Sequence, residues 1–141
     1  MHYSKSHSIT ASNVTPEQIW RVWSDFEKRH LWDDDIEWAK LNGEFKAGNT
    51  FIFKPKGGPK LKMHIIEATK NKSFADCFKM LFTQLCGIHT IKESPKGLIL
   101  TTTITVKGPL RWILQKLVAE KIVATLPHQT ELLLKAARAI K

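Results

Sequence analysis

The feature that most constrains the fold is the order of its segments: a short polar strand, a well-capped helix, a long run of strand-like segments and one long final helix. The strand-like segments lie near residues 3–10, 36–41, 50–55, 60–69, 72–81, 84–93 and 97–106. The later connections are too short to hold crossover helices, so neighbouring strands should be antiparallel. We therefore predict an α+β fold in which a seven-stranded antiparallel sheet curls around one long C-terminal helix. A sheet curled in this way is expected to enclose a cavity.

The helix after the first strand has a clear start. Thr15 is a suitable N-cap, Pro16 occupies the first helical position, and Gln18 follows the cap by three residues, which together form a capping box. The residues that recur at helical spacing and give this helix its apolar face are Ile19, Val22, Trp23 and Phe26. We expect two short helices here, before the strand near 36–41.

The last helix is expected to begin after Gly108 and Pro109, which end the final strand. It spans about 30 residues, and its apolar stripe contains Leu110, Ile113, Leu114, Leu117, Val118, Leu126, Leu133 and Ala137. Pro127 lies inside the stripe and should kink the helix or break it in two.

Composition narrows the class of protein. The 141 residues suit one domain, and no stretch approaches the ~20 apolar residues that cross a bilayer. The net charge of +9 is spread along the chain without a zinc-finger or RNA-binding signature, so we do not expect nucleic-acid binding. The two cysteines, Cys77 and Cys86, follow a chain start without a signal-peptide pattern, which predicts reduced thiols and a cytoplasmic location.

The cavity face can be predicted from the alternation of side chains in a hairpin. If residues 72–81 and 84–93 pair about a turn at Phe82–Thr83, Asp76 lies opposite His89 on a face that is otherwise apolar or glycine. The turn lacks Gly or Asn, so no turn residue fixes this register. The residues predicted to contact a ligand are Met63, Ile65, Phe74, Asp76, Phe78, Met80, Leu85 and His89.

Asp76 and His89 allow two interpretations. His89 could act as a general base or anchor a ligand carbonyl or hydroxyl, with Asp76 fixing its tautomer. Alternatively, the two side chains form a buried pair that satisfies its own hydrogen bonds. The run Asp33-Asp34-Asp35 lacks the spacing of a calcium loop, and no histidine pair has metal-ligand spacing, so we expect neither a metal nor a cofactor.

Several segments together resemble one family. The stretch VTPEQIWRVWSDFEKRHLWDDDIEWAKLNGEFKAG, the strands after it and KGPLRWILQKLVAEKI are similar to the polyketide cyclase/dehydrase branch of the START-like (SRPBCC) superfamily. The resemblance covers nearly the whole chain, which it implies is a single START-like domain, residues 1–141, with the helix-grip fold and a deep apolar cavity. Members of the superfamily bind lipids, sterols, polyketides or plant hormones, and only some are enzymes.

We therefore expect a binding protein for an apolar or amphipathic small molecule of lipid, polyketide or aromatic type. Two alternatives remain open: a cyclase or dehydratase that uses Asp76 and His89, and a lipid carrier that docks on anionic membranes. The third possibility follows from strand direction, which should bring the turns at 55–60 and 82–83 together with residues 107–112. The residues expected at that end are Lys54, Lys56, Lys60, Lys62, Lys107, Arg111, Phe82 and Trp112. Ligand identity, catalysis and oligomeric state do not follow from the sequence.

Overall fold

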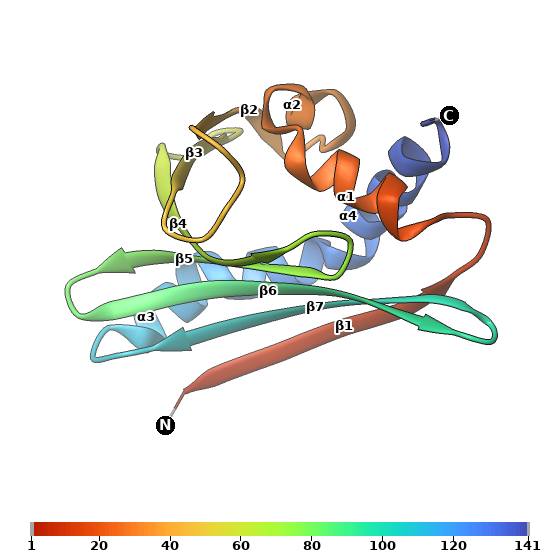
Figure 1. Ribbon diagram of the computed structural model, residues 1–141. Helices are drawn as coiled ribbons and strands as arrows, with labels where there is room; N and C mark the ends of the chain where they lie inside the picture. The colour runs from red at the N-terminus through yellow and green to blue at the C-terminus, as the bar shows by residue number, and fades with distance from the viewer. Residues whose placement is uncertain (1, 141) are drawn as a thin grey trace.

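The computed structural model describes residues 2–140 and contains one antiparallel sheet of seven strands in the order β1-β7-β6-β5-β4-β3-β2 (Figure 1). The strands are β1 (Tyr3–Ala11), β2 (Ile36–Asn42), β3 (Thr50–Pro55), β4 (Leu61–Thr69), β5 (Ser73–Met80), β6 (Thr83–Ser94) and β7 (Gly97–Lys107). The predicted curled antiparallel sheet is confirmed. Each strand is joined to the next by a hairpin except for β1, whose pairing with β7 places the first and last strands side by side.

Three short helical segments follow β1: α1 (Pro16–Ser24), the 3₁₀ turn η1 (Phe26–Lys28) and α2 (Arg29–Trp32). The capping box forms as predicted. The Gln18 amide donates to Thr15 Oγ1 at 3.2 Å, and the Thr15 amide donates to Gln18 Oε1 at 2.9 Å. These hydrogen bonds satisfy backbone amides that have no partner within the helix, and so they fix Thr15 as the residue at which the helix begins.

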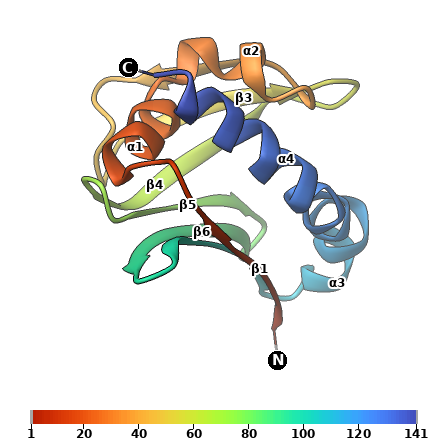
Figure 2. The ribbon, with the colours of Figure 1, turned by 90° about the vertical axis from the view of Figure 1, so that its right-hand side faces the viewer.

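The C-terminal helix comprises α3 (Arg111–Leu114), a π-helical turn η2 (Gln115–Ala119) and α4 (Glu120–Arg138). It lies across the concave side of the sheet, as Figure 2 shows. Of the two predicted effects of Pro127, a kink or a break, the break does not occur, because α4 runs through Pro127 as a single element. Leu126 and Thr130 are buried on either side of Pro127, and this packing holds the helix together despite the one missing amide donor. No helix in residues 2–140 is long and apolar enough to cross a membrane.

The β5–β6 hairpin differs from the prediction in its register. Its two-residue turn is Leu81–Phe82, with φ angles of 46° and 62°, so Met80 pairs with Thr83 and Asp76 pairs with Gly87. The predicted pairing of Asp76 with His89 is wrong by two positions along the partner strand, and Phe74 takes the place opposite His89. Because side chains alternate with a period of two, this shift leaves the same residues on the concave face.

The corrected register also changes the cysteine chemistry. Cys77 and Cys86 are direct partners on β5 and β6 and form a disulfide. The prediction of reduced thiols is therefore wrong. The predicted turn would have separated the two residues along the hairpin, whereas the observed turn places them opposite each other.

Three clusters of buried apolar side chains surround the concave face instead of merging into one. One joins α1 to the end of α4, one lies under β2, β3 and β4, and one joins β6 and β7 to the start of the C-terminal helix. Since a long sheet curls around a single helix, these clusters leave space between them.

Candidate functional site

The space between the three clusters is a cavity of about 600 Å³, bounded by the inner faces of strands β2–β7 and by α4. Pockets of this size bind drug-sized molecules in other proteins. Six of the eight residues singled out from the sequence line it: Met63, Phe74, Asp76, Phe78, Leu85 and His89. The other two lie elsewhere. Ile65 is packed in the cluster under β2–β4, and Met80 stands partly exposed at the end of the hairpin.

Sequence reasoning missed a group of polar residues in the cavity wall. Arg29, Thr102, Lys121 and Gln129 all line the cavity. Thr102 could have been found from strand alternation, because it pairs with His89 across β6 and β7. Lys121 and Gln129 follow helical spacing from Leu117, so the same face of the helix carries apolar and polar contacts.

Gly87 creates the polar part of the cavity. A methyl group at this position would lie 3.2 Å from Asp76 Oδ1 and 3.3 Å from His89 Nε2, so both side chains border the space that the missing side chain leaves. The two residues therefore meet diagonally across the hairpin, although they are not paired directly. Their polar atoms are aimed at one point on an apolar wall.

The position of the His89 ring is fixed by its neighbours. It stacks on Phe74 with a centroid distance of 4.3 Å, and Trp23 packs against it at 5.9 Å. Its Nδ1 lies 3.3 Å from Thr102 Oγ1, a hydrogen bond in which either group can donate, depending on the tautomer. These contacts leave Nε2 directed toward Gly87 and the cavity.

Burial sets the charge states of this pair. It raises the pKa of Asp76 to about 7, against the opposing effects of the Arg29 charge and the Gly87 amide. It also lowers the pKa of His89 to about 3, and the positive charge of Arg29 acts in the same direction. Near neutral pH, His89 is uncharged and Asp76 exchanges its proton readily. The site can therefore donate and accept hydrogen bonds without a full ion pair.

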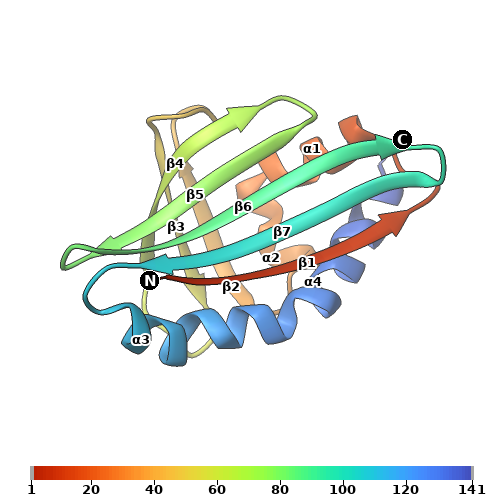
Figure 3. The same ribbon diagram turned by 90° about the horizontal axis from the view of Figure 1, so that it is seen from below.

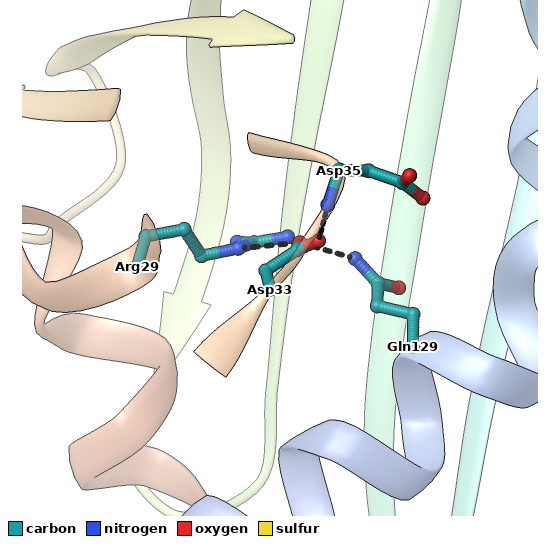
Figure 4. A network of polar contacts seen from close by, with 4 residues as sticks. All are labelled: Arg29, Asp33, Asp35 and Gln129. Atoms are coloured by element: carbon teal, nitrogen blue, oxygen red, sulfur yellow. Dashed lines mark hydrogen bonds and ion pairs between the residues drawn. The ribbon is translucent and has the colours of Figure 1, made fainter. Parts of the chain in front are cut away.

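A second polar cluster connects the chain before β2 to α4 (Figure 4). Asp33 Oδ2 accepts from Arg29 Nε at 3.0 Å and from Gln129 Nε2 at 3.1 Å, while its Oδ1 accepts from the Asp35 amide at 3.1 Å. Asp33 is buried, and these donors satisfy its carboxylate. The carboxylates of residues 33–35 come close enough to hold a cation, but the Asp33 oxygens already serve to tether the helix to the loop.

The chain resembles known proteins in structure and not in sequence. No family model matches it, and no curated protein sequence does. Many solved structures share its fold. Protein MLL2253 from Mesorhizobium loti superposes on this chain with a TM-score of 0.71 at 15% identity. The superposition covers 99% of each chain.

Two structures with described activities are also similar. The di-domain ARO/CYC protein StfQ from the steffimycin biosynthetic pathway has a TM-score of 0.72 at 10% identity, covering 99% of this chain and 50% of that one. A norcoclaurine synthase point mutant from Thalictrum, in complex with a transition-state analogue, has a TM-score of 0.66 at 14% identity and covers 96% of both chains. At these identities the likeness establishes the helix-grip fold, as predicted.

Proposed function

We propose that residues 1–141 form a single START-like domain that binds one apolar or amphipathic small molecule in the cavity. The observation that carries the proposal is a cavity of about 600 Å³ whose walls are largely aromatic and aliphatic and whose sheet side holds a buried polar pair, Asp76 and His89, beside Gly87. Ligand sites in proteins combine these features, since apolar walls supply affinity and a few polar groups fix orientation.

The charge states of the polar pair suggest the chemistry of the ligand. A protonated Asp76 donates a hydrogen bond to a carbonyl oxygen, whereas uncharged His89 can donate or accept through Nε2. A neutral ligand carbonyl or hydroxyl satisfies both side chains without burying an uncompensated charge. We therefore infer a mostly apolar ligand with a carbonyl or hydroxyl group, which includes polyketide, aromatic and lipid types.

A second candidate is an enzyme of cyclase or dehydratase type, as in the polyketide cyclase/dehydrase branch. The pKa of about 7 for Asp76 favours it, because a general acid or base works best when its pKa lies near the operating pH. Asp76 would take or give the proton, and His89 would hold the substrate oxygen. The likeness to StfQ and to norcoclaurine synthase supports keeping this candidate, although the chain spans only half of StfQ.

Uptake of an apolar fluorescent probe tests the cavity. Phe78→Trp enlarges a side chain in the cavity wall and should reduce uptake, whereas Met80→Trp makes a similar change two residues away, outside the cavity, and should not. Thermal unfolding of both variants checks that they fold. Equal uptake by Phe78→Trp and the unmodified protein would show that the cavity does not bind the probe.

His89→Ala separates the two candidates once native mass spectrometry has identified a co-purified ligand. For a binding protein, the variant should lose affinity. For an enzyme, turnover should fall much more than affinity, because the lost interaction matters most in the transition state. Unchanged binding and turnover would remove His89 from the site.

A further inference from the structure

The apex of the β5–β6 hairpin is unusual for a protein surface. Phe82 is 98% exposed and Leu81 is 69% exposed, and both have positive φ angles. A two-residue turn with this backbone favours Asn-Gly, because few side chains accept a left-handed conformation readily. Neither the turn geometry nor burial therefore favours Leu81 and Phe82 at these two positions. A function outside the isolated fold explains these two residues best.

Two further apolar side chains lie at the same end of the molecule. Trp112 is 64% exposed on α3, and Leu117 is 61% exposed on η2. The hairpin and α3 are in direct contact, because the Leu110 amide donates to Thr83 Oγ1 at 2.9 Å. Figures 1 and 3 both show the hairpin turn and α3 at one end of the sheet. We call Leu81, Phe82, Trp112 and Leu117 the apical surface.

The charge around the apical surface is mainly positive. The two segments that carry the apical surface, residues 77–86 and 105–119, contain no Asp or Glu, and neither does the β3–β4 segment 54–62, which lines the cavity together with Leu117. Their basic residues are Lys54, Lys56, Lys60, Lys62, Lys79, Lys107, Arg111 and Lys116. Within residues 2–140, Lys54 pairs with Glu37 and Lys116 pairs with Glu120, while the other six are in no ion pair.

The apical surface also borders the cavity. Leu117 lines the cavity wall, and residues 56–59 of the β3–β4 loop line it from the facing side. An apolar molecule that entered between these elements would pass from the apical surface into the cavity. This arrangement connects an exposed apolar surface with a buried apolar space.

We propose that the apical surface docks on an anionic lipid bilayer, with Leu81, Phe82 and Trp112 inserted among the headgroups and the surrounding lysines facing lipid charges. Protruding apolar side chains ringed by basic residues suit a fluid anionic surface, to which each added charge contributes about fivefold in affinity. A protein partner or a second copy would instead require a broad complementary face, whereas these side chains project from a narrow turn and a short helix. The proposal goes beyond ligand binding, since docking depends on none of the residues in the polar pair.

Vesicle co-sedimentation with the double variant Leu81→Asn, Phe82→Gly tests the apolar contribution. Asn-Gly is the preferred sequence for this turn, so the variant should fold at least as stably as the unmodified protein while losing both apolar side chains. We expect the unmodified protein to bind vesicles containing phosphatidylserine at low salt and the double variant to bind about tenfold more weakly. Leu31→Asn is the control, because Leu31 is about as exposed as Leu81 but lies on α2, outside the apical surface.

The charge contribution is tested with Lys79→Gln and Lys107→Gln. Each should weaken binding about fivefold, and high salt should abolish the difference. Lys92→Gln and Lys96→Gln remove charges from the opposite end of β6 and β7 and should leave binding unchanged. The proposal is overturned if vesicles with and without phosphatidylserine bind equally, or if the Asn-Gly variant binds as well as the unmodified protein.

Analytical ultracentrifugation without lipid tests whether a second copy of the chain binds the apical surface instead. Self-association that the Asn-Gly variant abolishes would assign the apical surface to a second copy and refute the bilayer proposal. Probe uptake by the cavity is measured separately, so a failure of docking leaves the proposed ligand binding intact, and the reverse also holds.

Discussion

Replacing Asp76 by Asn should make the protein more stable at alkaline pH. The substitution keeps the shape of the side chain and removes its ionisation. In the folded protein, burial raises the pKa of Asp76 to about 7 from its ordinary value of 3.8. Asp76 is 8% exposed, so solvent screens this effect little. The unfolded chain therefore ionises at lower pH than the folded chain.

The sign and size of the effect follow from this difference. Below pH 3.8 the carboxyl is protonated in both states, and its contribution to stability is fully present. As the pH rises from 3.8 toward 7, the carboxyl ionises in the unfolded chain but not yet in the folded one, so the free energy of unfolding falls. Above pH 7 the loss levels off. A pKa change from 3.8 to about 7 corresponds to about 4 kcal/mol.

Urea unfolding followed by tryptophan fluorescence at pH 5, 6, 7 and 8 measures this directly. We expect the advantage of Asp76→Asn to grow with pH and to approach about 4 kcal/mol at pH 8. Asp34→Asn is the control, because a hydrogen bond from His128 lowers the pKa of Asp34 and its neutralisation should give no such gain. A difference that stays flat with pH would mean that Asp76 ionises normally, which would refute the effect of burial on its pKa.

Three further predictions concern the same region. His89→Gln should remove a loss of stability that the unmodified protein shows as pH falls from 6.5 toward 3, because burial lowers the pKa of His89 to about 3; acid unfolding monitored by circular dichroism checks this. Gly87→Ala should reduce uptake of carbonyl-bearing probes more than of hydrocarbon probes, since the methyl group crowds Asp76 Oδ1 and His89 Nε2; equal losses would contradict it. Asp33→Asn should destabilise the protein by about 2–3 kcal/mol in urea unfolding, because the charged acceptor for Arg29 is lost.

The sequence was sufficient for the elements whose local signals agree. Thr15, Pro16 and Gln18 marked the start of α1 correctly because capping is a local interaction between residues three apart. The strands were found because alternation and turn residues point to the same boundaries. A shift of two in the hairpin register leaves side-chain faces unchanged, so Phe74, Asp76, Phe78, Leu85 and His89 line the cavity in spite of the register error, although Met80 does not.

The sequence failed where a turn lacks a local signal. Leu81–Phe82 has neither Gly nor Asn, and its left-handed backbone is imposed by the strands on either side. This one error also concealed the disulfide, because the pairing of Cys77 with Cys86 follows only from the correct register. The Arg29, Asp33 and Gln129 network could not be predicted either, since it joins residues about a hundred positions apart through tertiary packing.

The β5–β6 hairpin links the apical surface to the polar pair and so suggests the length of the ligand. Thr83 stands at the apex, and Gly87 lies four residues along the same strand, a span of about 13 Å in strand geometry. A molecule that places its carbonyl or hydroxyl beside Gly87 and extends back to the apical end would therefore be about 13 Å long. Among probes of equal polarity but graded chain length, binding should strengthen until the chain spans this distance and should then level off. Affinity that rises steadily beyond that length would place the polar group of the ligand somewhere other than beside Asp76 and His89.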